Sequence, residues 1–430
     1  MRLILLDRLT ETRFHFDPIA LSRPIWDLKC GMTSLGDKLI AKTGASDVAC
    51  FLPPYMADVY REQSDWAIND PASLGGDDLL LVNARVKASD FSVAPGGPSQ
   101  VAFDKNGDCL FARINKSDLA GLNADSLDAF LASAKEAVPH AEGNVPVWNY
   151  IWELVLANPD QLTEDFRAAG RSGIDNADVE EPNAIRGSRD DVYIAPGVSI
   201  HPMVVIDAEH GPVYIDEGAE IHPFSRIEGP CYIGKKSILL GAKCREGNSI
   251  GPMCRVGGEV EESIIHGYSN KYHDGFLGHA YVGEWVNLGA LTTNSDLKND
   301  YSSVSVSLDG GKAIDTGSTK VGSLIGDHTK TSIGTLFNTG SYVGAMALIA
   351  ATGKPLPKFI PSFAWFLEGV VTKGFGKRKL YETAETAMGR RGREWSPAQL
   401  AMWEEIFRLT AAPRKEAIKK GRRALRAQHT

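Results

Sequence analysis

The chain has 430 residues, of which 43% are hydrophobic and 23% charged, so it is not a disordered chain and is long enough for two or three domains. Its net charge of −8 argues against a nucleic-acid-binding protein, and its six scattered cysteines, without a C-x-x-C, argue against a zinc ribbon or a disulfide scaffold. Glycine is abundant, with 43 residues that follow no collagen period.

The first 140 residues predict an α/β domain. Short apolar runs at 3–6, 48–52 and 79–82 are typical of parallel strands buried on both faces, and a helical stretch at 32–44 ends on a glycine. The first run is too short for a signal peptide or a membrane span, so we expect a cytoplasmic protein without a membrane partner. A helical connector follows at about 125–168, and we place this domain at 1–186.

Beyond this domain, isoleucine recurs every six residues, at 194, 200 and 206 and again at 215, 221, 227 and 233. With a period of six residues, each short strand points one aliphatic side chain inward, and three such strands close one coil of about 18 residues. We therefore predict a left-handed parallel β-helix of hexapeptide repeats over 187–357; an ordinary β-sandwich with a chance period is the alternative. Breaks in the period at 207–214, 266–276 and 296–320 predict loops that leave the coil.

Residues 358–430 predict a helical, basic tail. From 377 to 430 there are 14 Lys/Arg and 6 Asp/Glu, a net charge of +8 that leaves −16 for the rest of the chain. Such a tail suits a nucleic acid, a nucleotide phosphate or an acidic neighbouring subunit, and its simplest interpretation is a solvated helix packed on the β-helix.

Polar side chains gather at 269–301, where the six-residue period is interrupted twice. Transfer of an acyl group to an amine needs a group that takes a proton near neutral pH, and the loop histidine His273 is suited to this. Around it stand cations of the kind that bind a sugar phosphate and asparagines suited to hydroxyls or the amine: Arg255, Lys271, Asn287, Asn294 and Lys298.

Six motifs follow one another in this half of the chain: GYSNKYHDGFLG (267–278), GEWVNLGA (283–290), NSDLKNDY (294–301), GDHTKT (326–331), FNTG (337–340) and KFIPSFAW (358–365). They resemble the acetyltransferase domain of the bifunctional N-acetylglucosamine-1-phosphate uridylyltransferase / glucosamine-1-phosphate N-acetyltransferase family, in the variant form of some bacteria. The similarity continues more weakly across the N-terminal domain. It implies a homotrimeric β-helix that N-acetylates a hexosamine 1-phosphate with acetyl-CoA, paired with UDP-sugar synthesis from UTP by a sugar-nucleotidyltransferase-like, Rossmann-like domain.

The resemblance also implies roles for single residues. His273 takes the place of the general base, Asn287 and Asn294 that of substrate-contacting asparagines, and Lys298 and Arg255 that of phosphate ligands. The pantetheine arm of acetyl-CoA would lie along the coil at Ala290, Lys330, Ser332 and Ala350. Two departures stand out: Phe276 replaces a tyrosine of the family, and Glu261 replaces a lysine, which weakens phosphate binding or alters the amino sugar that is used.

The N-terminal domain departs further from the family. No glycine follows the first strand, where a glycine-rich phosphate loop is expected, and Asn83 and Ala84 replace a glycine and a metal-binding aspartate. Arg13 and Arg23 remain as candidate nucleotide contacts. We assign no metal ligand, because the Mg²⁺ that nucleotidyl transfer requires loses a carboxylate here. Two alternatives stay open: nucleotidyl transfer is altered or lost, or it is retained as in the family.

Two other functions remain alternatives to the acetyltransferase. One is a sugar-1-phosphate nucleotidyltransferase whose β-helix serves only as a trimerisation scaffold. The other is a non-enzymatic, trimeric sugar-nucleotide-binding protein. His273 together with Asn287 and Lys298 argues against the scaffold, whereas the missing glycine-rich loop and aspartate favour a non-enzymatic role for the N-terminal half alone.

Overall fold

The N-terminal domain is built on one six-stranded sheet of order β3-β2-β1-β4-β6-β5, in a computed structural model that describes all residues except 142–143 and 429–430. The strands are β1 (Arg2–Leu6), β2 (Asp47–Phe51), β3 (Ala67–Ile68), β4 (Leu79–Asn83), β5 (Gln100–Phe103) and β6 (Cys109–Ile114). The first four are parallel, and β6 runs antiparallel to both of its neighbours, β4 and β5. The three predicted apolar runs are β1, β2 and β4, and all five residues of β4 are buried, as expected for a central strand.

Helices cover both faces of this sheet. They are α1 (Leu35–Thr43), α2 (Ala57–Arg61) and α3 (Leu127–Ala137), with 3-10 turns at Glu11–Phe16, Ile19–Leu21, Ile25–Asp27, Pro54–Met56, Pro71–Leu74 and Leu119–Gly121. The predicted helix is α1: Ser34 and Asp37 form a reciprocal capping box at its start, and Gly44 ends it at φ 64°. One apolar cluster lies on each face of the sheet, so the domain has the layered α/β architecture that the sequence predicts.

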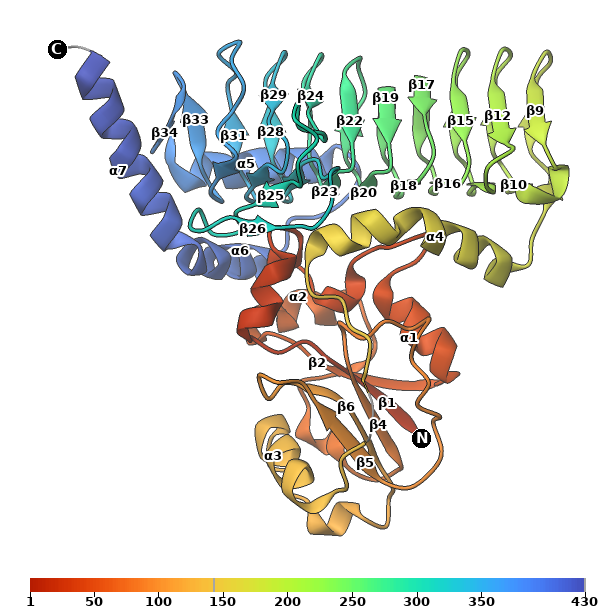
Figure 1. Cartoon of the computed structure of the whole chain (residues 1–430), viewed down its shortest axis with the longest axis vertical. Helices are drawn as coiled ribbons and strands as arrows, with labels where there is room; N and C mark the ends of the chain where they lie inside the picture. The colour runs from red at the N-terminus through yellow and green to blue at the C-terminus, as the bar shows by residue number, and fades with distance from the viewer. Residues whose placement is uncertain (142–143, 429–430) are drawn as a thin grey trace.

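The second domain is a parallel β-helix with three flat faces, which confirms the predicted architecture (Figure 1). Face A consists of β7 (Gly173–Ile174), β10 (Val192–Ile194), β13 (Val213–Ile215), β16 (Cys231–Ile233), β18 (Asn248–Ile250), β20 (Ile264–Gly267), β23 (Tyr281–Glu284), β27 (Leu324–Ile325), β30 (Tyr342–Val343) and β32 (Phe359–Ile360). Helix α4 (Ile151–Ala169), within the predicted connector, lies along this face.

The other two faces follow in the same order along every complete coil. Face B consists of β8 (Asp178–Val179), β11 (Ser199–Ile200), β14 (Glu220–Ile221), the first halves of β17 (Ile238–Cys244) and β19 (Arg255–Glu261), β21 (Asn270–Lys271), β28 (Lys330–Thr331), β31 (Leu348–Ile349) and β33 (Trp365–Leu367). Face C consists of β9 (Ala184–Gly187), β12 (Val205–Ala208), β15 (Arg226–Glu228), the second halves of β17 and β19, β22 (Phe276–Gly278), β24 (Thr293–Asn294) and β29 (Leu336–Phe337).

The six-residue period places its aliphatic residues inside the coil, as predicted. On face A the backbone pairs Ile194, Ile215, Ile233 and Ile250 in register, and all four are buried. Each residue of this column sits directly on the same position of the next coil, so the interior is one continuous apolar core.

The boundaries of the β-helix differ from the prediction at both ends. Its first coil is β7, β8 and β9, so it begins at residue 173 rather than 187, in a segment without the isoleucine period. It extends to 367, past the predicted end at 357, because β32 and β33 still pair with the coil before them. In the first coil Ile174, Val179 and Ile185 pair in register with isoleucines of the next coil, but the spacing of five residues between the first two departs from the strict period. In the last coil Ile360 and Phe366 are buried in the same apolar core.

Only one of the three predicted loops leaves the coil. The segment 296–320 does so and carries a small antiparallel hairpin, β25 (Ser305–Val306) with β26 (Ile314–Asp315). By contrast, 266–276 contains β21, which pairs with β19, and 207–214 only joins β12 to β13 around a corner. These two predictions are wrong because polar residues or a longer turn interrupt the sequence period without interrupting the stack.

The chain ends in three helices, as the sequence predicts. After β34 (Val370–Thr372), which runs antiparallel to β33, come α5 (Gly376–Gly389), α6 (Pro397–Leu409) and α7 (Ala411–Gln428). The tail is predicted to be helical from residue 358, but the coil strands β32 and β33 come first and the helices begin at residue 376. Within the described part of the chain, no helix combines the length and apolarity needed to cross a membrane.

Candidate functional site

A row of polar side chains runs along face B over four neighbouring coils. Arg255, Asn270, Asn287 and Lys330 occupy the same position of successive coils, paired in register through their backbones. Because alternate residues of a strand point to opposite faces, all four face away from the apolar interior. Asn270 donates from Nδ2 to Oδ1 of Asn287 at 3.1 Å. The repeat thus brings together three predicted site residues that lie up to 75 positions apart.

Helix α5 covers this row and encloses a cavity of about 660 Å³. Its side of the cavity includes Lys379, Arg390 and Arg391, which no site prediction named. Arg391 donates from Nη2 to Oδ1 of Asn270 at 3.0 Å, so the tail and the β-helix are joined inside the cavity. The sequence signal for these residues is the RRGR run at 390–393, which counted only toward the total charge of the tail.

The cavity concentrates positive charge, since five cations and one carboxylate, Glu382, line it; the cations are Arg255, Lys330, Lys379, Arg390 and Arg391. Burial lowers the pKa of Lys330 to about 8. The pKa of Arg391 is lowered mainly by burial and, to a lesser extent, by the nearby guanidinium of Arg255. The Nε atom of Arg255 is buried and has no hydrogen-bond partner among the described residues. Buried donors are almost always paired, so an unpartnered guanidinium nitrogen among other cations indicates a site for an anion.

Stacked aromatic rings form one wall of the cavity. Tyr268 and Trp285 stack at 4.4 Å between ring centroids, and Trp285 stacks on His328 at 6.1 Å. Tyr268 accepts a hydrogen bond from Arg393 at 2.6 Å, and His328 meets Trp403 of α6 edge-on at 5.5 Å. These contacts fix the tail helices against the corner between faces A and B and so hold the roof of the cavity in place.

His273 lies at the next corner, between faces B and C, and its side chain is exposed. It is joined to the cavity through Tyr272, whose ring lies 5.8 Å from His273 and 5.8 Å from the guanidinium of Arg255. The turn that carries His273 is held by the next coil, since the N–H of Leu291 donates to the carbonyl of Asp274 at 2.9 Å. The structure therefore places the histidine beside the cationic cavity.

The predicted acetyl-CoA contacts lie at this same edge. Ala290 accepts a hydrogen bond from the N–H of Gly334, and Ser332 accepts one through Oγ from the N–H of Ala351, next to Ala350. These residues are neighbours on successive coils. A Cβ on Gly289 would lie 2.5 Å from the carbonyl carbon of Ser332, so only glycine permits this spacing there. Lys330, predicted with this group, lies instead in the cavity.

Two predicted substrate ligands point into the coil instead of toward the cavity. Lys271 occupies an inward position paired with Val256; its ammonium is buried and donates to the carbonyls of Gly257 at 2.8 Å and His273 at 2.7 Å. Asn294 is also buried, and its side chain bonds both backbone groups of Gly278. The six-residue period that turns isoleucines inward does the same to these two polar residues, so neither is available to bind substrate from the surface.

The remaining predicted ligand and the two departures lie outside the cavity. Lys298 is on the 296–320 loop, where its ammonium contacts Ser302 and the carbonyl of Ser303. Glu261, in place of a family lysine, is buried on face C and paired with Arg245 at 2.6 Å and Lys320 at 3.1 Å. Phe276 begins β22 of the same face. None of the three lines the cavity with Arg255.

The two arginines predicted to contact a nucleotide are buried in ion pairs. Arg13 donates from Nε to the carboxylate of Asp7 at 3.0 Å. Arg23 donates from Nη2 to Asp327 of the β-helix at 2.5 Å and lies 3.4 Å from Glu284. Because both guanidiniums neutralise buried carboxylates, their roles differ from the prediction: Arg13 braces the first loop, and Arg23 joins the two domains.

A second cavity, of about 740 Å³, lies where the segments after β1 and β4 meet. His15 stacks on Tyr150 at 4.5 Å, and Tyr150 on Trp152 at 4.3 Å, which gives the cavity an aromatic wall suited to a base. Arg85, which follows β4, also lines it. Carboxyl ends of parallel strands are the usual ligand-binding edge of such a sheet.

The residues of this edge do not fit a magnesium ion. Asn83 bonds the carbonyl of Cys109 and the N–H of Arg85, so it serves the backbone. The carboxylates of Asp104 and Asp108 lie 3.2 Å and 3.9 Å from Arg85. Mg²⁺ prefers carboxylate and water oxygens, and here the carboxylates are already neutralised by an arginine. We therefore derive no chemical step through a metal in this domain.

Comparison with known proteins supports the family resemblance. Residues 3–172 match the family model of sugar nucleotidyl transferases. The chain is 37% identical over 91 residues to a bifunctional sugar-1-phosphate nucleotidylyltransferase/acetyltransferase of Sulfurisphaera tokodaii, a match that covers 21% of this chain and 22% of that protein. It is 29% identical over 147 residues to the bifunctional protein GlmU of Rippkaea orientalis, which covers 33% of this chain and 30% of that protein. The chain thus matches less than a third of the length of these relatives.

Two solved structures also match part of the chain. A crystal structure of a UDP-N-acetylglucosamine acyltransferase is 14% identical with a TM-score of 0.25, covering 58% of this chain and 95% of that one. The UDP-N-acetylglucosamine acyltransferase of Arabidopsis gives 14% identity, a TM-score of 0.24 and the same coverage.

Proposed function

Residues 3–172 match the sugar nucleotidyl transferase family, and from this premise and the bifunctional relatives we propose that the protein is a two-domain amino-sugar enzyme. Its β-helix transfers an acetyl group from acetyl-CoA to the amine of a hexosamine 1-phosphate. Its N-terminal domain handles the sugar nucleotide. The single observation that carries the proposal is the cationic cavity between face B and α5, with His273 joined to its Arg255 through the ring of Tyr272.

The sugar phosphate binds in this cavity. Arg255, with its buried unpartnered Nε, faces Lys330 and Arg391 across a space lined by asparagine side chains. Guanidinium groups bind phosphate oxygens in pairs, and their attraction is strengthened where water is excluded. Asn270 and Asn287 offer amide groups to the hydroxyls of the sugar. Lys330 is therefore assigned to the sugar phosphate rather than to acetyl-CoA.

The transfer itself needs one base. The amine nitrogen attacks the thioester carbonyl carbon, a C–N bond forms, the C–S bond breaks, and the CoA sulfur leaves with the electron pair. His273 takes the proton that the attacking nitrogen loses and passes it to the departing CoA sulfur, and backbone N–H groups at the corner stabilise the oxyanion. The products are an N-acetylhexosamine 1-phosphate and the free thiol of CoA.

Acetyl-CoA lies along the edge that carries Ala290, Ser332 and Ala350. The corner beside them exposes apolar side chains on several coils; relative exposures are 54% for Met203, 75% for Phe224, 62% for Leu291 and 73% for Ile333. Exposed apolar residues along one edge of a β-helix indicate a surface that another molecule covers. We assign it to neighbouring copies in a homotrimer, which light scattering tests by a particle mass of three times 46.6 kDa.

The function of the N-terminal domain rests on a different observation. The family match and the aromatic cavity of about 740 Å³ favour a uridine nucleotide as its ligand. The neutralised carboxylates favour slow or absent nucleotidyl transfer, and so a domain that binds a sugar nucleotide without making it.

Two assays test these assignments with purified full-length protein. Glucosamine 1-phosphate and acetyl-CoA are supplied while free thiol is followed, and separately N-acetylglucosamine 1-phosphate, UTP and Mg²⁺ are supplied while pyrophosphate is followed. We expect thiol release to fall at least about 100-fold in His273→Ala, which removes the base, and to be unchanged in His210→Ala, an exposed histidine on another coil.

Each assay has an outcome that overturns its claim. Equal thiol release by wild type and His273→Ala removes the acetyltransferase and leaves the β-helix as a scaffold. Pyrophosphate release at an ordinary enzymatic rate shows that the replacement of the family aspartate has not disabled the first domain. A protein that binds UTP but releases neither product is the non-enzymatic alternative.

A further inference from the structure

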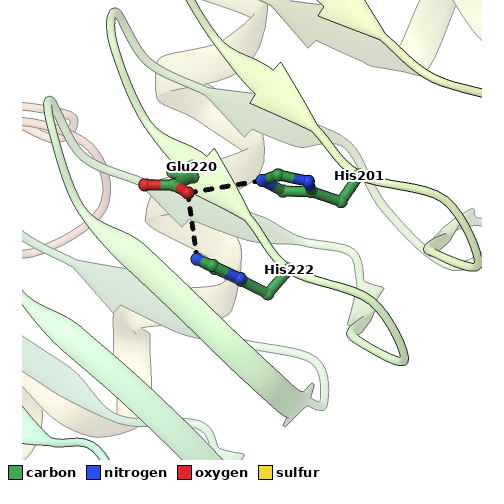
Figure 2. A group of neighbouring side chains, drawn as sticks. All are labelled: His201, Glu220 and His222. Atoms are coloured by element: carbon green, nitrogen blue, oxygen red, sulfur yellow. Dashed lines mark hydrogen bonds and ion pairs between the residues drawn. The ribbon is translucent and has the colours of Figure 1, made fainter.

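Two histidines and a glutamate meet on face B near the beginning of the β-helix, several coils before the cationic cavity (Figure 2). His201 and His222 follow β11 and β14, in two repeats that both read IHP. Since β11 and β14 pair in register, their imidazoles stack on neighbouring coils with centroids 4.9 Å apart. Glu220, the first residue of β14, points between them.

The three donor atoms converge as a metal requires. Oε1 of Glu220 lies 3.3 Å from Nε2 of His201 and 3.0 Å from Nε2 of His222. A zinc ion with bonds of about 2.0–2.2 Å in tetrahedral geometry holds its ligand atoms about 3.3 Å from one another. The two glutamate–histidine distances are thus close to the edges of a zinc tetrahedron, and the donor atoms of the two histidines lie within 4.8 Å of each other. The side chains are half-exposed, so an ion has access.

A fourth residue orients one of the histidines. Oε1 of Glu180, on the preceding coil, lies 3.3 Å from Nδ1 of His201. Metal-bound histidines usually give their other ring N–H to a carboxylate, which fixes the tautomer and makes the ligand nitrogen more basic. Glu180 accepting from Nδ1 leaves the lone pair of Nε2 directed toward Glu220.

We propose that His201, Glu220 and His222 bind a zinc ion, with water in the fourth position. The ion would clamp two neighbouring coils at the outer surface, in addition to the ion pair of Arg226 with Asp207 that also joins them. The two histidines lie 21 residues apart in the chain, and only the coil brings them together.

Another acidic group shows what distinguishes this site. Glu246, Glu261 and Glu262 also converge, but they include no histidine, and the buried Glu261 is neutralised by Arg245 and Lys320. This second group therefore lacks the nitrogen ligands and the unbalanced charge that zinc favours.

The test is zinc binding by the intact protein, measured by calorimetry with Zn²⁺ alone and by the visible spectrum after Co²⁺ is added. We expect one equivalent of Zn²⁺ per chain and the intense Co²⁺ absorption of a tetrahedral site. His201→Ala and His222→Ala should each weaken binding at least about 100-fold, and Glu180→Gln about 10-fold, as losses in the outer shell do. His210→Ala and Glu262→Gln are the matched controls and should bind as wild type.

The six cysteines do not confuse this readout, because all of them are buried thiols in the folded protein. Circular dichroism confirms that each variant is folded before it is titrated. Absence of zinc binding in the wild type, a weak octahedral Co²⁺ spectrum, or equal affinity in His222→Ala and His210→Ala each overturns the proposal. In these cases the cluster is only a set of histidine–glutamate ion pairs.

Discussion

A lysine takes the place of an aliphatic residue inside the β-helix at position 271. Its neighbour in the inward column is Val256, and its stem is packed with the apolar interior. Burial lowers its pKa to about 8. Its ammonium ends on the carbonyls of Gly257 and His273, so a buried cation holds the turn that carries the candidate base. Lys271 is therefore a positioning residue.

The substitution Lys271→Met separates this positioning from stability. Methionine keeps the apolar stem and removes a buried charge, so we expect a Tm equal to or above that of the wild type. The carbonyl of His273 loses its donor, and we expect kcat for acetyl transfer to fall about 10-fold with KM unchanged. Steady-state kinetics and a thermal melt check both. An unchanged kcat would show that the turn does not need Lys271.

Lys330 predicts how substrate binding depends on pH. Its pKa is about 8, so the ammonium is charged below this pH and neutral above it. The substrate phosphate, with a second pKa of about 6, is already a dianion there. We expect KM for the hexosamine 1-phosphate to rise about 10-fold between about pH 7 and pH 9.

Lys330→Arg provides the control, because arginine stays charged throughout this range. Its KM should be nearly flat over the same interval, while Lys330→Met should have a raised KM at every pH. The same rise in the wild type and in Lys330→Arg would mean that another group titrates.

At the scale of elements, most of the fold could be predicted from local sequence patterns. The sequence predicts the buried strands β1, β2 and β4, the capped helix α1 and the inward isoleucines, because each depends on residues close together in the chain. The first coil at 173–187 was not predicted, since its inward residues Ile174, Val179 and Ile185 do not keep the strict six-residue isoleucine period. Strand β21 was not predicted, because polar residues occupy its positions.

The candidate site could be predicted only in part from the sequence, for a different reason. Asn287 and His273 lie in the motifs, Arg255 was predicted as a phosphate ligand, and the structure places all three on neighbouring coils. Arg391 could not be found, because its role depends on how α5 folds back over face B. Lys271 was predicted to face the substrate, although it lies six residues after Ile265 and the six-residue period therefore places it inside the coil.

One ion pair ties the 296–320 loop to the coil. His279 lies between Asp296, at 2.8 Å, and Glu262, at 3.1 Å. Burial opposes its charge, but the hydrogen bonds to both carboxylates prevail and raise its pKa to about 9. The folded value exceeds the unfolded 6.5, so the stabilisation is complete below about pH 6.5 and is lost as the pH rises through 9.

We therefore expect the stability difference between wild type and His279→Gln to shrink with rising pH. The shift from 6.5 to about 9 corresponds to about 3 kcal/mol, most of which should disappear between about pH 6 and pH 9.5. Urea unfolding of both proteins at the two pH values measures it. A pH-independent difference would mean that His279 is neutral in the folded protein.

At the scale of the whole molecule, the two domains meet at face A through buried polar contacts. Asp327 accepts from Arg23 at 2.5 Å and from the hydroxyl of Ser22 at 2.6 Å. The hydroxyl of Tyr281 bonds the backbone of Lys29 on both sides. Such contacts fix the orientation of the domains, since a buried charge cannot be left without its partner.

A double-mutant cycle on Arg23 and Asp327 tests this joint. Arg23→Met should lower stability by about 3–5 kcal/mol, because it leaves the buried carboxylate of Asp327 without its cation. Asp327→Asn should lower stability by less, because Arg23 keeps Glu284 at 3.4 Å. The double variant should lose at least about 1 kcal/mol less than the two losses together. Calorimetric unfolding measures all four proteins. Strict additivity would show that the pair does not join the domains.

The loop at 296–320 leaves the β-helix between two coils that nevertheless stack directly on each other, since Tyr281 pairs with Leu324 and Val282 with Ile325. The loop separates the two coils in the sequence, but it does not separate them in the stack. The tip of the hairpin at 309–312 is exposed, although Gly310 lies against the ring of Phe359, so foreign sequence belongs after it, at 311–312. This fold therefore offers a natural place to graft a peptide or a fluorescent domain.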